Sequence, residues 1–201
     1  GLYAITDSRL TGDLPVETAV EQAIRGGARV IQYRDKQAGR NARETTALHL
    51  AGLCRSHGIP LIINDDIGLA ARSGAAGVHL GRADSPLLEA RRQLGPAAII
   101  GISCYNNLDR ARAAVAGGAD YVAFGRFFPS GSKPDAVPAA PALLSRARDL
   151  LDVPLVAIGG ITPDNGAALL EAGADLLAAI EGVFGQPDIE AAARRYAELF
   201  Q

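Results

Sequence analysis

The sequence contains no tryptophan, no methionine, only two cysteines and three histidines, and no apolar run long enough to span a bilayer. Cys54 and Cys104 stand outside any CxxC or metal-ligand spacing, so we expect both to be packing residues of a protein in the reducing cytoplasm. The histidines form no HExxH pattern, which disfavours a zinc site. The first residues lack the layout of a secretory signal peptide, in keeping with a cytoplasmic location.

An excess of positive charge is also missing. The 20 Lys and Arg residues stand against 22 Asp and Glu residues, which gives a formal net charge of -2. Proteins that bind nucleic acid or a membrane surface usually carry a basic excess, so we expect neither partner, and any anion site must be local. With 201 residues, 48% of them apolar, and no linker or low-complexity tract, the chain is expected to form one domain over residues 1–201.

Short apolar runs alternate with segments of helical periodicity along the whole chain. Eight strands are predicted, at residues 2–6, 30–33, 61–64, 77–80, 99–103, 121–125, 155–158 and 176–180. Eight helices are predicted, at residues 16–25, 42–56, 67–72, 85–94, 108–115, 142–150, 165–171 and 189–200. The strands are nearly all apolar, which is typical of parallel strands buried on both faces.

A Gly-Ala phrase recurs just before four of these strands, at residues 26–29, 73–76, 117–120 and 172–175. A glycine after a helix end supplies a left-handed cap, and the chain then turns into the next strand. Eight such βα units in 201 residues predict an α/β protein with a single (β/α)8 (TIM) barrel and its active site at the C-terminal ends of the strands. A doubly wound sheet is the alternative, but it more often carries a GxGxxG turn after its first strand, which this sequence lacks.

The stretch Gln-Tyr-Arg-Asp-Lys at residues 32–36 follows the second predicted strand. In an extended chain, period-2 alternation places Gln32, Arg34 and Lys36 on one side and the other two residues on the opposite side. Arginine holds phosphate oxygens in a fork and lysine adds a point charge, so this side predicts a polyanion site. The alternative is an exposed strand end whose cations pair with nearby carboxylates.

Carboxylates follow the third and fourth predicted strands. Asp65 and Asp84 come from adjacent strands and can reach one Mg²⁺ ion, which prefers oxygen ligands and shares its other positions with phosphates and water. Helix capping is the alternative for each carboxylate, because Asp66 and Asp84 directly precede helical segments. Their joint placement favours the metal for Asp65 and Asp84 and capping for Asp66.

Two further segments suggest phosphate binding. Gly159 and Gly160 follow the seventh strand, where glycines commonly let the backbone approach a phosphate near a helix N-terminus, with structural turn glycines as the alternative. The irregular segment 126–141 contains hydroxyls, backbone amides and a cation at residues 130–133, and long loops of this kind are often functional lids or disordered.

Together these motifs resemble those of the thiamine phosphate synthase (thiamine-phosphate pyrophosphorylase) family, in the same order and over essentially the whole chain. The motifs that carry the resemblance lie at residues 1–7, 32–36, 64–66, 77–81 with Asp84, 124–134 and 157–162. The resemblance implies a transferase that joins a hydroxymethylpyrimidine pyrophosphate to a thiazole phosphate and releases pyrophosphate, with one Mg²⁺ per active site.

The resemblance also implies roles for individual residues. Those implied for the pyrimidine pyrophosphate are Gln32, Arg34, Lys36, Asn64, Ser103 and Lys133, and Tyr33 and Asp35 are also expected to bind substrate. Those implied for the thiazole phosphate are Ser130, Gly131, Ser132, Gly160, Ile180 and Glu181. Asp65 and Asp84 are implied for Mg²⁺, and Arg34, Lys36, Ser103 and Lys133 for catalysis. In this family the thiazole nitrogen attacks a carbocation-like pyrimidine, so no protein nucleophile is required. That agrees with the expected lack of a Ser-His or Cys-His pair at the barrel mouth.

Three positions depart from the common family pattern. Arg82 stands where Gln is usual, Glu181 stands where a small or neutral residue is usual, and Tyr105 stands where related sequences have His. A related thiazole tautomerase uses a His near Tyr105 and lacks the full pyrophosphate and metal set, so the synthase is favoured. The second alternative is a non-catalytic sensor of a phosphorylated ligand on the same scaffold. The sequence leaves open whether the chain forms a homo-oligomer.

Overall fold

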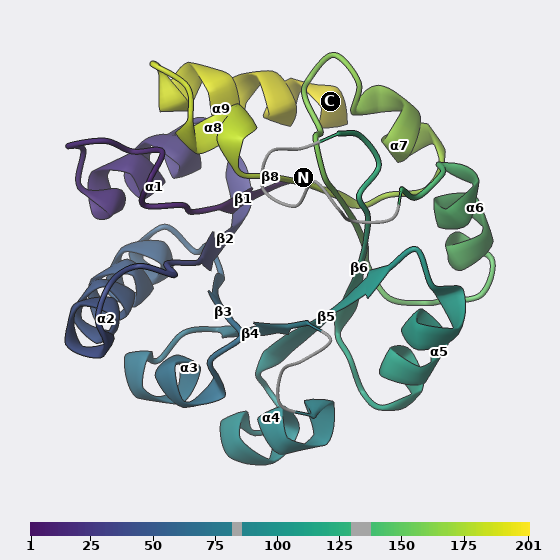
Figure 1. Cartoon of the computed structure of the whole chain (residues 1–201), viewed down its shortest axis with the longest axis horizontal. Helices are drawn as coiled ribbons and strands as arrows, with labels where there is room; N and C mark the ends of the chain where they lie inside the picture. Colours follow the sequence, from purple (N-terminus) through teal and green to yellow (C-terminus); the bar gives the residue numbers. More distant parts are fainter. Residues whose placement is uncertain (82–85, 130–137) are drawn as a thin grey trace.

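The computed structural model describes residues 1–81, 86–129 and 138–201. Within them, eight parallel strands close into a barrel in sequence order, with β8 hydrogen-bonded to β1 (Figure 1). The strands are β1 (Leu2–Ile5), β2 (Ala28–Tyr33), β3 (Leu61–Asn64), β4 (Gly77–Leu80), β5 (Ile99–Tyr105), β6 (Tyr121–Phe124), β7 (Leu155–Ile158) and β8 (Leu176–Ala179).

Helices surround this barrel on its outside (Figure 1). They are α1 (Val16–Arg25), α2 (Arg40–Ser56), α3 (Ile67–Ser73), α4 (Leu87–Leu94), α5 (Leu108–Ala116), α6 (Ala142–Arg148), α7 (Ala167–Glu171), α8 (Glu181–Phe184) and α9 (Ile189–Ala197), followed by the 3₁₀ helix Glu198–Phe200. Across the described ranges, none of these helices is both long enough and apolar enough to cross a bilayer.

The predicted (β/α)8 barrel is confirmed, and the doubly wound alternative is wrong because the sheet closes on itself. The strands predicted at 61–64, 77–80 and 155–158 and the helix predicted at 16–25 have the observed bounds. Strand β5 continues past its predicted end to Tyr105. Helix α8 was not predicted, because four residues are too few to show helical periodicity.

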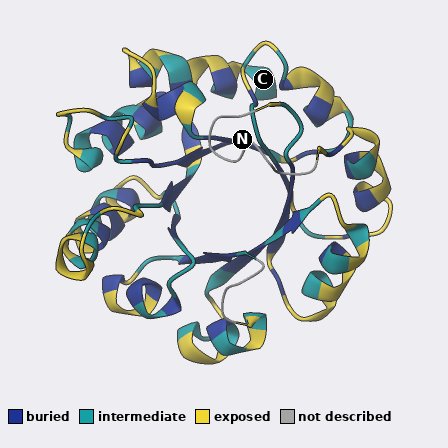
Figure 2. Cartoon of the chain, viewed as in Figure 1, coloured by how far each residue is buried: buried dark blue, intermediate teal, exposed yellow. Residues whose placement is uncertain are grey.

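Buried residues occupy the strands and the sides of the helices that face the barrel (Figure 2), and they form two apolar layers. The larger layer lies between the outer faces of the strands and the helices, which explains why the strands are almost continuously apolar. The smaller layer fills the barrel interior and consists of Tyr3, Ile5, Tyr121, Ala123, Val156 and Ala178, with partly buried apolar neighbours. The interior therefore contains two tyrosines rather than aliphatic side chains alone.

Gly101 on β5 makes room for one of these tyrosines. A Cβ atom at this position would lie 1.9 Å from Cζ of Tyr121, which is far inside van der Waals contact. The absence of a side chain on β5 therefore lets the Tyr121 ring from β6 lie across the barrel interior. This glycine is required by close packing and not by an unusual backbone angle.

The motifs Gly118-Ala119-Asp120 and Gly173-Ala174-Asp175 directly precede β6 and β8, at the N-terminal ends of the strands. The glycines adopt the predicted positive φ, with values of 94° at Gly118 and 111° at Gly173. Each aspartate that follows then binds the start of a neighbouring strand. Asp120 Oδ2 accepts hydrogen bonds from Ile100 N and Arg91 Nη2, both 2.7 Å away. Asp175 repeats this arrangement on β7 with Leu155 N and Arg148.

Substituting Asp120 tests this arrangement. Asp120→Ala leaves the Ile100 amide without its acceptor, so we expect the free energy of unfolding to fall by about 1–3 kcal/mol. Asp120→Asn keeps an acceptor oxygen and should lose less. Urea unfolding at unchanged m-value measures both, and an alanine variant as stable as the parent would contradict the role of Asp120.

Candidate active site

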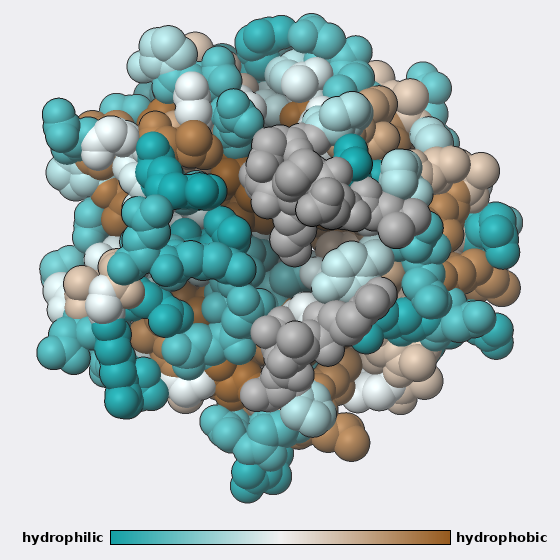
Figure 3. All heavy atoms as spheres, viewed as in Figure 1, coloured by the Kyte–Doolittle hydropathy of each residue, from teal (hydrophilic) through white to brown (hydrophobic). Residues whose placement is uncertain are grey.

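Two cavities open at the C-terminal ends of the strands and meet at Asn64, which lines both. The inner cavity, of about 440 Å³, occupies the barrel mouth. The outer cavity, of about 760 Å³, lies among the segments that follow β2 and β3. Hydrophilic residues predominate over that part of the surface (Figure 3).

Seven of the residues predicted for substrate binding line the inner cavity together. They are Gln32, Arg34, Asn64, Ser103, Gly160, Ile180 and Glu181. They come from the ends of β2, β3, β5, β7 and β8, which barrel closure brings to one place. The predicted residues Asp84, Ser130, Gly131, Ser132 and Lys133 lie outside the described residues.

The predicted sidedness of residues 32–36 is wrong for Lys36. Gln32 and Arg34 line the inner cavity, but Lys36 lines the outer cavity with Tyr33 and Asp35. The reason is that β2 ends at Tyr33 and the chain then bends. Asp35 Oδ1 stabilises the bend by accepting hydrogen bonds from the amides of residues 37 and 38, at 2.8 and 3.0 Å.

The bend also determines the ionisation of Asp35. Burial by itself raises the pKa of this carboxyl group, but the two amide hydrogen bonds from Ala38 and Gln37 act in the opposite direction, and the net pKa is lowered. Asp35 was predicted to bind substrate. Its hydrogen bonds give it a structural role in the bend, and its contact with a substrate stays a prediction.

Arg34 is held by a carboxylate that was not predicted from the sequence. Arg34 Nη1 donates to Asp7 Oδ2 at 3.3 Å, and the Arg34 amide donates to Thr6 Oγ1 at 2.9 Å. Arg9 adds a second cation, with Nη2 2.6 Å from the same Asp7 oxygen. The hydrogen bond from the Arg9 side chain lowers the pKa of Asp7 to about 2. Burial acts in the opposite direction and raises this pKa, whereas the positive charge of Arg34 lowers it further. Asp7 follows β1, so its place at a strand end was the available signal.

Asp65 lies in the outer cavity in an unusual backbone conformation. Its φ is 64°, in the left-handed region that few non-glycine residues adopt. Hydrogen bonds maintain this conformation, from Asn64 Nδ2 to Asp65 Oδ2 at 2.7 Å and from Asp65 N to the His79 carbonyl at 2.9 Å. Backbone strain that the surroundings maintain is typical of functional sites.

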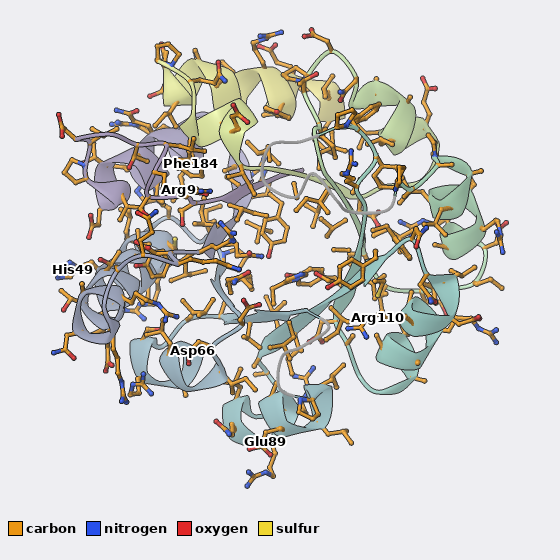
Figure 4. All side chains as sticks on the ribbon, viewed as in Figure 1. Arg9, His49, Asp66, Glu89, Arg110 and Phe184 are labelled. Atoms are coloured by element: carbon orange, nitrogen blue, oxygen red, sulfur yellow. The ribbon has the colours of Figure 1, made fainter. Side chains whose placement is uncertain are left out.

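The structure confirms that Asp66 caps a helix. Its Oδ1 accepts a hydrogen bond from Leu69 N at 2.8 Å at the start of α3, where Figure 4 labels it. Within the described ranges, neither Asp65 nor Asp66 belongs to a group of three or more His, Cys, Asp or Glu side chains that could hold a metal ion. The Asp65 carboxylate still suits Mg²⁺, because this ion usually binds one or two protein carboxylates and fills its other coordination positions with water and phosphate oxygens.

A serine and a histidine do meet at the barrel mouth, so the expectation of no Ser-His pair is wrong. His79 Nε2 lies 2.8 Å from Ser103 Oγ, and both side chains line the inner cavity. The second ring nitrogen of His79 lies 2.9 Å from the Tyr121 hydroxyl. A hydrolase triad would have a carboxylate in that position. Period-2 alternation along β4 and β6 was the signal that could have placed His79 and Tyr121 in the interior.

The Ser103 backbone is fixed by an arginine on α5. Arg110, labelled in Figure 4, donates from Nε to the Ser103 carbonyl at 2.8 Å and from Nη2 to the Gly81 carbonyl at 3.0 Å. It therefore joins β5 to the segment that follows β4. Its guanidinium carbon also lies 5.9 Å from the ring centroid of Tyr105, which lines the inner cavity with φ of 57°. Tyr105 therefore occupies the site itself.

The glycine pair after β7 has a structural explanation. Gly160 has φ of 61°, and a Cβ atom there would lie 2.2 Å from the Pro129 carbonyl oxygen. The pair thus packs against the backbone that follows β6, as the structural alternative proposed. Gly160 also lines the inner cavity, and its approach to a phosphate stays a prediction.

The closed barrel and the two cavities at its strand ends, both lined by polar side chains among others, are those of a (β/α)8-barrel enzyme that acts on small molecules. The family model described as thiamine monophosphate synthase matches residues 2–183. The chain therefore belongs to the thiamine monophosphate synthase family, and it is a transferase of thiamine biosynthesis.

Individual relatives support this assignment over the full length. The chain is 52% identical to the thiamine-phosphate synthase of Thioalkalivibrio sulfidiphilus, covering 100% of this chain and 95% of that protein. It is 54% identical to that of Marinobacter nauticus, covering 100% and 90%. The solved structure of thiamine phosphate pyrophosphorylase from Pyrococcus furiosus aligns with a TM-score of 0.90 at 34% identity, covering 98% of this chain and 94% of that one.

The low pKa of Asp7 generates a pH prediction. Because the folded pKa, about 2, lies below the ordinary value of 3.8, the ionised carboxylate stabilises the fold above about pH 4, and this contribution disappears as the pH falls from 3.8 towards 2. Asp7→Asn lacks the contribution at every pH. We therefore expect the difference in unfolding free energy between parent and variant to be constant above about pH 4 and to shrink below it. Urea unfolding across this range measures the difference, and a pH-independent difference would reject the assignment.

Proposed function

We propose that the protein condenses 4-amino-2-methyl-5-hydroxymethylpyrimidine pyrophosphate with thiazole phosphate to give thiamine phosphate and pyrophosphate. One observation carries this proposal: residues predicted for the first substrate, Gln32, Arg34 and Ser103, line the same cavity as Gly160 and Glu181, which are predicted for the second. A cavity of about 440 Å³ is within the size range of small-molecule sites and suits two heterocycles held face to face.

The two cavities suggest a division of the first substrate. In our proposal its pyrimidine ring occupies the inner cavity, and its pyrophosphate extends past Asn64 into the outer cavity. Lys36 and Asp65 line the outer cavity, so they would meet the pyrophosphate or its counter-ion. Arg34, which is 16% exposed and held by Asp7, would contact the pyrophosphate from the inner side.

The proposed chemistry is departure of pyrophosphate followed by attack of the thiazole nitrogen on the pyrimidine methylene carbon. Arg34, Lys36 and Lys133 would stabilise the negative charge that develops on the leaving group. Arg34 would need little reorganisation, because Asp7 and Thr6 already hold its side chain and amide. Holding both substrates in one cavity would supply much of the remaining acceleration.

Asp65 and Asp84 would hold one Mg²⁺, which when bound supplies additional positive charge to the departing pyrophosphate. The Asn64 amide supports this role for Asp65, because its hydrogen bond fixes the carboxylate in the outer cavity. The cytoplasm is the location we propose for this activity, in agreement with two buried, unpaired cysteines among the described residues.

Pyrophosphate release tests the proposed function. With both substrates and Mg²⁺ present, we expect the purified protein to release pyrophosphate and form thiamine phosphate in equal amounts. Omitting the thiazole phosphate or adding a chelator should stop product formation. A folded protein that binds both substrates and releases nothing would be a sensor, and isomerisation of a thiazole without pyrophosphate release would identify a tautomerase.

Neighbouring aspartates provide a matched test of the metal site. Asp65→Asn removes a proposed metal ligand. Loss of a residue that only supports a metal ligand typically costs up to about 100-fold in activity, so we expect turnover at saturating substrate to fall by at least that factor. Asp66→Asn is the control, because Asn also caps helices and the substitution leaves Asp65 in place. Both variants should keep the circular dichroism spectrum of the parent. Equal activity of the Asp65 variant and the parent would remove Asp65 from the metal site.

A further inference from the structure

A chain of five hydrogen-bonded side chains crosses the barrel interior between two residues of the inner cavity. It starts at Gln32, whose Nε2 lies 2.9 Å from the Tyr3 hydroxyl. The Tyr3 and Tyr121 hydroxyls are 2.7 Å apart, and Tyr121 lies 2.9 Å from His79 Nδ1. The chain ends where His79 Nε2 lies 2.8 Å from Ser103 Oγ. The proposed function assigns both end residues, Gln32 and Ser103, to the pyrimidine substrate.

The direction of every hydrogen bond in this chain follows from its first donor. The Gln32 amide donates to the Tyr3 oxygen, so the Tyr3 proton is directed to Tyr121. The Tyr121 hydroxyl then donates to His79 Nδ1, which makes His79 the tautomer protonated on Nε2, and that proton goes to Ser103 Oγ. With Gln32 Nε2 as the donor, any other order leaves a hydroxyl proton without an acceptor on Tyr3 or Tyr121, which are 2% and 5% exposed.

Both ends of the chain face the inner cavity with a defined polarity. The Gln32 side chain is buried, and within the described ranges its Oε1 atom has no hydrogen-bond donor. The Ser103 oxygen already accepts from His79, so its own proton remains available to a ligand. The cavity therefore presents an acceptor at Gln32 and a donor at Ser103.

Packing keeps the connecting rings in place. The His79 and Tyr121 rings stack with centroids 5.6 Å apart and an interplanar angle of 23°, and the Tyr3 ring meets Tyr121 edge-on at 5.9 Å. Gly101 leaves room for Tyr121, and Arg110 holds the Ser103 backbone. Burial raises the pKa of Tyr3 to about 12, so its hydroxyl stays protonated near neutral pH.

We infer that Tyr3, Tyr121 and His79 are positioning residues that make the inner cavity select an aminopyrimidine over the corresponding oxopyrimidine. An aminopyrimidine has an N–H donor for Gln32 Oε1 and an unprotonated ring nitrogen that accepts from Ser103. In the oxo form a carbonyl acceptor replaces the amino group and a ring N–H replaces the unprotonated nitrogen. The carbonyl would then face the acceptor Gln32 Oε1, and the ring N–H would face the proton of Ser103. The inference rests on the proposed function, because it takes the pyrimidine as the occupant of the cavity.

The tautomer of His79 tests the polarity without any substrate. The chain has three histidines, and His49 and His57 are exposed, so His49→Gln with His57→Gln leaves His79 as the only histidine. In this background, ¹⁵N NMR should show a proton on Nε2 and none on Nδ1. Gln32→Glu replaces the first donor by a carboxylate, so the chain should reverse and move the proton to Nδ1. A proton on Nδ1 before the Gln32 change, or an unchanged tautomer after it, would overturn the inference.

Steady-state kinetics test the consequence for substrate selection. Tyr121→Phe interrupts the chain, so the KM for the pyrimidine pyrophosphate should rise by about tenfold, whereas the KM for the thiazole phosphate should stay unchanged. The preference for the amino substrate over an oxo analogue as a competitive inhibitor should fall by a similar factor. Tyr196→Phe is the matched control, because it removes another buried phenol hydroxyl, bonded to the Ile161 carbonyl at 2.7 Å, outside the chain.

Each outcome separates the inference from the proposed function. Equal changes in both KM values for Tyr121→Phe, or the same change for Tyr196→Phe, would indicate general structural loss and reject selection by the chain. A parent protein that releases no pyrophosphate would reject the proposed function, and the His79 tautomer would still decide the polarity. Should Tyr121→Phe fail to fold, the NMR measurement on the His49 and His57 variant decides alone.

Discussion

Eight short parallel strands with apolar residues on both faces must bury both faces, and they do so here by closing into a barrel covered by helices. Closure has a second consequence, because the interior is narrow and has to be filled. The chain fills it with Tyr3 and Tyr121, and Gly101 provides the room for the second ring. Phenol hydroxyls buried in an apolar interior need partners. Gln32 and His79 are these partners. The tyrosines that fill the barrel therefore also orient polar side chains at the bottom of the inner cavity.

Charged side chains of the two cavities are also held by hydrogen bonds within the protein. Arg34 and Asp65 have their partners in the protein before any substrate arrives: Asp7 holds the first and Asn64 holds the second. Such pairing lowers the cost of reorganising charged side chains when a polyanion binds. The outer cavity adds Lys36, which is exposed after a bend that Asp35 stabilises. Among the described residues, the site thus combines the preorganised Arg34 and Asp65 with the exposed Lys36.

The Ser-His contact illustrates how a familiar pair acquires a different role from its surroundings. In a hydrolase a carboxylate would orient the histidine and stabilise its charged form. Here the second nitrogen of His79 meets a phenol, which itself is bonded to another phenol. The contact therefore suits orientation of hydrogen bonds in the cavity, and it agrees with the proposed transfer reaction, which requires no protein nucleophile.

The sequence by itself determined the eight βα units, the strand ends on which the site is built and the capping role of Asp66, because these depend on local periodicity and turn chemistry. It did not predict helix α8, the turn of Lys36 into the outer cavity, or the contacts of Asp7 and His79. Only the tertiary structure decided these, since they join strands that are distant in the chain and depend on the width of the closed barrel. The alternation rule failed at Lys36 for a related reason: it holds only while the strand continues, and the strand ends where its neighbours stop pairing with it.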